Sequence, residues 1–324
     1  MDCLGVYMQI AAFTDFRERI INNISQIIVG KNDLLDSIVI AFICGGHILL
    51  EDIPGVGKTS LVKAFARSVG SRFSRVQFTP DLLPSDLTGI HYFNPKVNDF
   101  EFRPGPLFAD LILGDEINRA TPRTQSSLLE AMEEKQITVD GVTRKLADSF
   151  MVLATQNPIE SYGVFPLPEA QLDRFMMRLS VGYPSRTDEI LIATEYQKRK
   201  PEELSGVVTE AEIDYVKKAY QEVRCHTEVT AYLLDIVEAT RQSGKARLGT
   251  SPRGSIALYR ASQACAAISG REYVLPEDVK RMAPYVLNHR VLWKNPDNAG
   301  SLYHSIEEIV NEVRVPVEDG SYCH

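Results

Sequence analysis

Residues 50–60 read L-E-D-I-P-G-V-G-K-T-S, and this stretch decides how the rest of the chain is interpreted. It joins a short apolar run, His47–Glu51, to a segment with the pattern of a helix, Thr59–Val69. A glycine-rich turn between a buried strand and a helix that opens with Gly-Lys-Thr is the usual form of a phosphate-binding loop. Backbone N–H groups and the positive end of the helix together form a concave site for phosphate oxygens. A plain glycine turn is the alternative, but it would not explain why Gly-Lys-Thr occurs at the junction of a strand and a helix.

Each residue type in the loop suits one part of phosphate binding. Gly55 and Gly57 allow the backbone to approach the phosphates closely, and Lys58 places a positive charge on the β and γ oxygens. The Thr59 hydroxyl is expected to bind Mg²⁺. The residues that we expect to contact the nucleotide and its metal are Pro54, Gly55, Val56, Gly57, Lys58, Thr59 and Ser60.

One position departs from the general pattern G-x-x-x-x-G-K-[ST], because the first glycine of that pattern is Asp52 here. The need for glycine is greatest at Gly55 and Gly57, so a side chain at position 52 is able to point away from the phosphates. If it pointed inward, repulsion between like charges would weaken nucleotide binding.

A second candidate site follows the apolar strand in L-I-L-G-D-E-I-N, residues 111–118. Asp115 and Glu116 come at the carboxyl end of this strand, where ligands bind in open α/β sheets. Asp115 suits the outer shell of Mg²⁺, and Glu116 suits a base that orients and polarises an attacking water. An Asp-Glu pair after a strand is common by itself, and it gains meaning from the phosphate loop upstream.

Three further side chains are candidates. Asn157 follows a third apolar strand and is placed to hydrogen-bond an attacking water or a terminal phosphate, although Asn-Pro is usually a turn. Arg174, in L-P-E-A-Q-L-D-R-F (167–175), suits an arginine finger for a neighbouring subunit or an internal salt bridge. Arg253, in G-T-S-P-R-G-S (249–255), opposes the dipole of the helix that it opens, so an anionic partner is expected.

Strands and helices alternate up to about Pro184, which favours a parallel α/β sheet with right-handed crossovers. The expected strands are His47–Glu51, Phe73–Phe78, Leu111–Asp115, Phe150–Thr155 and Arg178–Tyr183, with a hairpin around Asp140-Gly141. The expected helices in this part are Asp15–Ile28, Asp33–Cys44, Thr59–Val69 and Thr121–Glu134.

After Pro184 only helices are expected, and no convincing strand pattern follows. They are Thr187–Lys200, Glu210–Cys225, Thr230–Arg241, Arg253–Ser269, Pro276–Leu287 and Leu302–Val313. The change of pattern predicts a domain boundary near 184–186.

Composition excludes several classes of function. The net charge is −8, with 43 acidic and 35 basic residues, which disfavours non-specific binding to nucleic acid. Five cysteines without metal-ligand spacing favour reduced thiols. No apolar run reaches the roughly 18 residues needed to span a membrane. The acidic start of the chain is a poor signal peptide, so a cytoplasmic location is expected.

Taken in order, these features resemble an AAA+ ATPase, and the details are similar to the MoxR family. The resemblance covers about residues 14–315. Its motifs are I-I-V-G (27–30), L-L-E-D-I-P-G-V-G-K-T (49–59), F-T-P-D-L-L-P-S-D-L-T-G (78–89), D-E-I-N-R-A (115–120), Q-S-S-L-L-E-A-M-E-E (125–134), A-T-Q-N-P-I-E (154–160), L-P-E-A-Q-L-D-R-F (167–175) and S-P-R (251–253). The Glu-Asp before the glycines is similar to what MoxR proteins commonly carry.

The resemblance implies a role for each candidate residue. Lys58 and Thr59 would belong to Walker A, Asp115 and Glu116 to Walker B, and Asn157 to sensor 1. Arg174 would be the arginine finger and Arg253 sensor 2, acting either on its own nucleotide or on a neighbour's. Ile28, Val29 and Gly30 would line the adenine pocket.

The resemblance also implies an architecture. Residues 1–185 would form a nucleotide-binding αβα core with a five-stranded parallel sheet of strand order 5-1-4-3-2. This core would carry a helix-2 insert at about 79–106 and a pre-sensor-1 hairpin at about 135–148. Residues 186–318 would form a helical lid domain, and residues 319–324 a tail.

The function implied is that of a Mg²⁺-dependent ATPase that converts ATP and water to ADP and phosphate while it remodels or matures a protein complex. It would work as a homo-oligomer, a hexameric ring, with a separate von Willebrand factor A domain protein as partner. Two alternatives stay open: a nucleotide-gated scaffold that hydrolyses little, and a nucleic-acid motor, against which the net charge counts.

Overall fold

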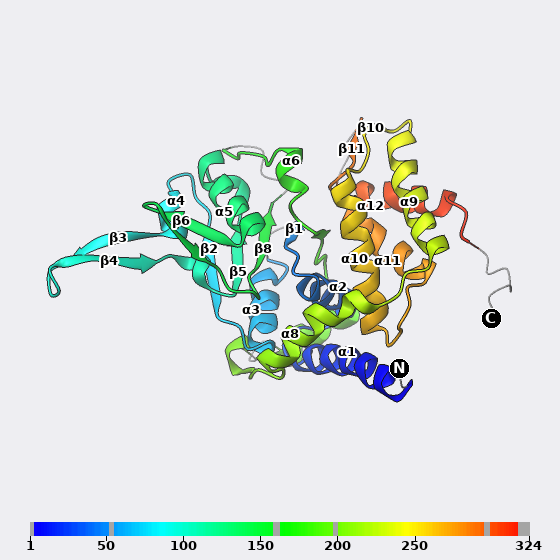
Figure 1. The fold of residues 1–324 in the computed structure, drawn as a ribbon, viewed down its shortest axis with the longest axis horizontal. Helices are drawn as coiled ribbons and strands as arrows, with labels where there is room; N and C mark the ends of the chain where they lie inside the picture. Colours follow the sequence, from blue (N-terminus) through cyan, green and yellow to red (C-terminus); the bar gives the residue numbers. More distant parts are fainter. Residues whose placement is uncertain (1–2, 52–54, 158–162, 197–199, 295–298, 317–324) are drawn as a thin grey trace.

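Five parallel strands form the central sheet of the computed structural model, which describes residues 3–51, 55–157, 163–196, 200–294 and 299–316 (Figure 1). The strands are β1 (Ile48–Glu51), β2 (Phe73–Gln77), β5 (Leu111–Asp115), β8 (Met151–Gln156) and β9 (Met177–Leu179). Their spatial order is β2-β5-β8-β1-β9. The expected order 5-1-4-3-2, counted over these five strands, is therefore confirmed.

Both faces of the sheet are buried, which explains why its strands are continuous apolar runs rather than alternating ones. Leu111 and Leu113 of β5 point into a cluster of apolar side chains shared with the helices on one face. Ile112, between them, points into a second cluster on the other face. Since successive side chains of a strand alternate between faces, each strand holds two helical layers together.

The helices of the first half cover these two faces. They are α1 (Cys3–Ile24), α2 (Asn32–Ile43), α3 (Lys58–Ser68), α5 (Pro122–Glu134) and the short α6 (Glu169–Leu172). Short 3-10 turns lie at Pro106–Phe108 and Ile117–Arg119. Buried residues of α1, α2 and α3 belong to the first apolar cluster, and those of α5 belong to the second.

Helix α1 differs from the expectation, because it begins at Cys3 and ends at Ile24 rather than running from Asp15 to Ile28. Thr14 lies inside the helix, where its hydroxyl donates to the Ala11 carbonyl at 3.0 Å. Phe13 is buried, which extends the apolar face of the helix toward its start.

Two antiparallel hairpins project from the first half of the chain. One is β6 (Gln136–Val139) with β7 (Val142–Lys145), close to the expected hairpin. The other lies in the predicted insert, where α4 (Pro84–Thr88) leads into β3 (Gly89–Asn94) and β4 (Asp99–Pro104). No strand was expected there. Figure 1 shows β3 and β4 extending away from the rest of the molecule.

The second half of the chain is mainly helical. Its elements are α7 (Arg186–Leu191) continued by a π-helical turn (Ile192–Tyr196), 3-10 turns at Pro201–Glu203 and Tyr220–Glu222, α8 (Glu210–Ala219), α9 (Thr227–Gln242), α10 (Pro252–Ile268), α11 (Pro276–Leu287) and α12 (Ala299–Glu312). Two short strands, β10 (Ala246–Leu248) and β11 (Leu292–Trp293), pair antiparallel. The expectation of no strand after Pro184 is therefore wrong, because strands of two or three residues are too short to show an alternating pattern.

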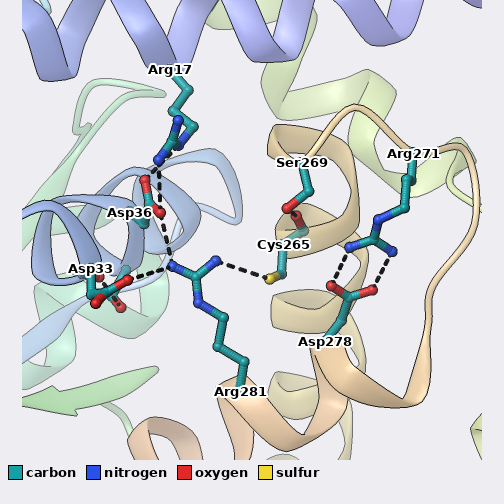
Figure 2. Close-up of polar contacts among 9 residues, drawn as sticks. Arg17, Asp33, Asp36, Cys265, Ser269, Arg271, Asp278 and Arg281 are labelled. Carbon is teal, nitrogen blue, oxygen red and sulfur yellow. Dashed lines mark hydrogen bonds and ion pairs between the residues drawn. The ribbon is translucent and has the colours of Figure 1, made fainter.

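A buried carboxylate joins the two halves (Figure 2). Asp36 of α2 accepts hydrogen bonds from Arg17 of α1 at 2.6 and 3.0 Å and from Arg281 of α11 at 2.8 Å. Arg281 also donates to the exposed Asp33 at 3.2 Å. Helices that are far apart in sequence are thus tied by one ionic network.

No described helix combines the length with the apolarity that crossing a membrane requires.

Candidate functional site

The glycine-rich turn lies at the carboxyl edge of the sheet, between the end of β1 and the start of α3. Gly55 has φ +89° and Gly57 has φ +86°, in the left-handed region that favours glycine. No described heavy atom comes within 4 Å of the position that a Cβ would take at either residue. The turn therefore needs glycine for its backbone conformation and leaves open space beside it, as a phosphate cradle requires. Asp52 and Pro54 lie outside the described residues.

A cavity of about 490 Å³ continues from this turn, a size that suits a small-molecule ligand. Three segments of the chain wall it: residues 27–31, residues 55–61, and the stretch that follows β9. Its apolar lining includes Ile28, Val29, Val56, Leu61, Val181 and Ile192. The site thus has an open, glycine-lined end and an apolar end, which suit the phosphates and the base of a nucleotide.

Gly30, expected in the base pocket, lies beside this cavity and lines a neighbouring one. A Cβ at Gly30 would come within 2.2 Å of the carboxylate of Asp188 on α7. Its φ of +69° is also left-handed. Glycine is needed here because α7 approaches the backbone closely.

The stretch after β9 was expected to be strand up to Tyr183, but β9 ends at Leu179. Gly182 has φ +63°, which breaks the extended conformation. The Lys31 ammonium donates to the carbonyls of Gly182 at 3.3 Å and Tyr183 at 2.9 Å. These contacts hold the segment across from residues 27–31 and turn it into a wall of the cavity.

The acidic pair lies at the same edge of the sheet, two strands away from β1. Asp115 is buried, and its carboxylate accepts hydrogen bonds from Arg75 Nε at 2.7 Å and Thr155 Oγ1 at 3.1 Å. Thr155 also accepts from the backbone N–H of Glu116 at 2.9 Å. The hydroxyl of Thr155 therefore fixes the turn that follows β5.

Glu116 has a left-handed backbone, with φ +58° and ψ +49°, which is uncommon for a residue with a side chain. Its carboxylate accepts from Gln77 Nε2 at 2.9 Å and is paired with Arg119 Nε at 3.1 Å. Strained conformations of this kind gather at functional sites. Asn157, directly after β8, is buried at the same edge.

Glu133 and Arg174 lie at the opposite, amino edge of the sheet. The residue before Glu133, Met132, accepts at its carbonyl a hydrogen bond from His47 Nε2 at 3.0 Å. Met176, two residues after Arg174, donates its N–H to the His47 carbonyl at 2.8 Å. His47 immediately precedes β1, while the glycine turn follows the other end of that strand, about 13 Å away. Arg174 is therefore remote from the glycine turn of its own chain.

Arg253 joins Arg174 at this edge. The carboxylate of Glu133 pairs with Arg174 Nε at 3.0 Å and with Arg253 NH2 at 2.6 Å. The anionic partner that was expected for Arg253 is thus Glu133.

Comparisons with known proteins agree with this arrangement. A family model described as "ATPase family associated with various cellular activities (AAA)" matches residues 47–177, and an AAA lid domain model matches residues 238–313. Chaperone MoxR1 of Mycobacterium tuberculosis is 38% identical over 292 residues, covering 87% of this chain and 77% of that protein. YeaC of Bacillus subtilis is 46% identical over 301 residues, covering 92% and 94%. The chain belongs to the MoxR family of AAA+ ATPases.

A solved structure of a related protein supports the fold of this MoxR-family chain. The crystal structure of a Cytophaga hutchinsonii protein assigned as an ATPase matches with a TM-score of 0.87 and 34% sequence identity. The match covers 97% of this chain and 98% of that one.

Sequence reasoning missed several side chains at the MoxR-family site. Arg75 and Gln77 are exposed residues on either side of the buried Val76 in β2, and the sequence pattern gave no sign of their partners. Thr155 immediately precedes the Gln-Asn-Pro stretch from which Asn157 was predicted as a site residue. Arg178 of β9 forms a buried ion pair with Glu51, the last residue of β1 before the loop. Burial lowers the pKa of Arg178 from its usual value.

Proposed function

We propose that this MoxR-family protein binds ATP with Mg²⁺ and hydrolyses the ATP to ADP and phosphate. The observation that carries this proposal is the carboxyl edge of the sheet, where the glycine turn and the Asp115–Glu116 pair lie at the ends of β1 and β5. Only β8 separates these strands, so a terminal phosphate held by the turn would face the acidic pair.

The donors at this edge fit a nucleotide and its metal. The open space beside Gly55 and Gly57 supports a phosphate cradle, completed by Lys58 and the N–H groups that open α3. The Thr59 hydroxyl and the Asp115 carboxylate are hard oxygen donors, which Mg²⁺ prefers. Since both Asp115 oxygens already accept protein hydrogen bonds, Asp115 suits the outer shell of the hydrated ion. When bound, Mg²⁺ would neutralise charge that develops on the phosphates.

Glu116 is the proposed base that orients the attacking water. Its left-handed backbone is fixed by the bond from its own N–H to Thr155, and its carboxylate is held by Gln77 and Arg119. Pre-organised groups of this kind lose little free energy in reaching the transition state. Asn157 is proposed to hydrogen-bond the water or the terminal phosphate from the end of β8.

A second copy of the chain would complete the site. Arg174 and Arg253 lie at the edge of the sheet opposite the glycine turn, which favours action on a neighbour's nucleotide. An interface that joins opposite edges of two copies is head-to-tail, and such interfaces form rings when the rotation between copies closes and open filaments when it does not. We propose a homo-oligomeric ring, hexameric as in the family resemblance.

The name of one relative, Chaperone MoxR1, supports a chaperone-like role. We propose that this role is the remodelling or maturation of a protein complex. As the family resemblance implies, we propose a separate von Willebrand factor A domain protein as partner. We place the protein in the cytoplasm. We divide the chain into a core (1–185), a helical lid (186–318) and a tail (319–324).

Steady-state ATP hydrolysis with Mg²⁺ tests the proposal, measured across protein concentration for the wild type and Glu116→Gln. We expect the wild-type rate per subunit to rise with concentration, and Glu116→Gln to bind ATP without turning it over. Tight binding without turnover by either protein would favour a nucleotide-gated scaffold. Failure of the wild type to bind ATP would refute the site and implicate Asp52.

A further inference from the structure

One carboxylate at the amino edge of the sheet serves two arginines from distant parts of the chain. Glu133 Oε2 pairs with Arg174 Nε at 3.0 Å, and Glu133 Oε1 pairs with Arg253 NH2 at 2.6 Å. All three side chains are partly exposed: 36% for Glu133, 31% for Arg174 and 49% for Arg253. The cluster is therefore held together by charge at a surface rather than buried in the core.

Glu133 and Arg253 each carry a charge that is unfavourable at its own end of its helix. Glu133 is in the last turn of α5, where the helix dipole is negative, and this turn contains no basic residue. Arg253 is in the first turn of α10, where the dipole is positive, and this turn contains no acidic residue. Since like charge at a helix end is destabilising, each needs an opposite charge from elsewhere. Glu133 and Arg253 supply that charge to each other.

Neighbouring contacts hold the backbones that carry the two arginines. Asp173, which precedes Arg174, accepts a hydrogen bond from Ser251 Oγ at 3.0 Å. The buried guanidinium of Arg290 donates to the other Asp173 oxygen at 2.8 Å and to the Phe175 carbonyl at 2.7 Å. Both segments are thus anchored before their side chains reach Glu133.

The cluster carries one positive charge in excess, because two guanidinium groups pair with one carboxylate. Two guanidinium groups carry ten N–H donors, and the two oxygens of one carboxylate cannot satisfy them all. A positive charge therefore remains at an exposed surface. An anion with several oxygens, such as a phosphate, suits the remaining donors.

We propose that Glu133 is a positioning residue, which holds Arg174 and Arg253 side by side as a two-arginine receptor for the terminal phosphate of a nucleotide bound to a neighbouring copy of the chain. The inference rests on the proposed ATPase function. Without the carboxylate, the two guanidinium groups repel each other, and their long side chains regain rotamer freedom. The receptor would then have to be assembled in each catalytic cycle.

The test compares Glu133→Gln with the matched control Glu134→Gln, the next residue on the same exposed helix end. A misplacement of about 1 Å in a catalytic group lowers rates by about 100-fold, so we expect kcat of Glu133→Gln to fall by about 10- to 100-fold. KM and the affinity for a fluorescent ATP analogue are expected to stay unchanged, because the glycine turn is at the opposite edge. Glu134→Gln should match the wild type, and Glu133→Asp, which keeps the charge, should lie between the wild type and Glu133→Gln.

A mixing experiment separates action on a neighbour from damage to the chain's own site. Glu116→Gln lacks the base but keeps the arginine receptor, whereas Glu133→Gln has the reverse defect. We expect mixtures of the two variants to hydrolyse ATP faster than either alone, because some interfaces combine both intact halves.

Three results would overturn the inference while leaving the ATPase proposal intact: wild-type kcat for Glu133→Gln, a higher kcat that marks Glu133 as an inhibitor, or no gain on mixing. Absence of turnover by the wild type would instead remove the proposed function, and the inference with it.

Discussion

Replacing Asp36 by alanine is expected to lower the free energy of unfolding by about 3 kcal/mol, because it removes the shared partner of two arginines. The Asp36 side chain is 5% exposed, while those of Arg17 and Arg281 are 29% and 35% exposed. Removing one partner of a fully buried ion pair costs about 3–5 kcal/mol. Water can reach both arginines after the change, so we take the lower end of this range.

Thermal unfolding followed by circular dichroism measures this loss. With an unfolding entropy of about 2.1 cal/mol/K per residue, a chain of 324 residues has about 0.7 kcal/mol/K in total. A loss of about 3 kcal/mol then lowers Tm by about 4 °C.

Asp33→Ala is the matched control. Asp33 contacts the same arginine at 3.2 Å, but its side chain is 89% exposed. Exposed ion pairs contribute about 0–1 kcal/mol, so its Tm should fall by no more than about 1.5 °C. If Asp36→Ala and Asp33→Ala lost equal stability, or if Asp36→Ala had the Tm of the wild type, the reasoning from burial would be refuted.

Three further predictions concern the site and the core. Lys58→Ala is expected to abolish nucleotide binding, and a titration with a fluorescent ATP analogue that shows wild-type affinity would contradict the role of the turn. Arg174→Ala should keep wild-type affinity in the same titration while kcat falls by about 1000-fold or more, as for other arginine fingers; full turnover would make Arg174 only a salt-bridge residue. Burial lowers the pKa of His47 to about 4, so between pH 6.5 and pH 4 the unfolded chain binds a proton that the folded chain excludes. As the pH is lowered through this window, the free energy of unfolding should therefore fall by about 1.4 kcal/mol per pH unit. A His47→Gln variant, compared by urea unfolding at each pH, should lack this part of the loss.

Much of the core was predictable because its signals are local in the sequence. A strand of the central sheet is buried on both faces, so Leu111–Asp115 reads as an apolar run without any knowledge of its neighbours. The glycine turn is set by positive φ angles at Gly55 and Gly57, a demand that the residue type itself reveals. The roles assigned to the nucleotide-site residues stay predictions that the assays above test.

Elements whose existence depends on distant contacts were less predictable. Helix α1 begins before Thr14 because Phe13 packs into a core built partly from helices of the second half of the chain. The β3–β4 hairpin was missed although Phe100 and Phe102 alternate with charged residues along β4, since two strands outside the main sheet gave no βα alternation to follow.

The sequence by itself therefore determined the sheet, the glycine turn and the acidic pair, because each rests on residue types within a few positions of one another. Only the tertiary structure decided which charges meet. Glu133 and Arg253 are 120 residues apart, and Arg281 and Asp36 are 245 apart. Local patterns cannot specify such pairs, because the energy of a charge depends on what the fold brings to it and on how far water is excluded.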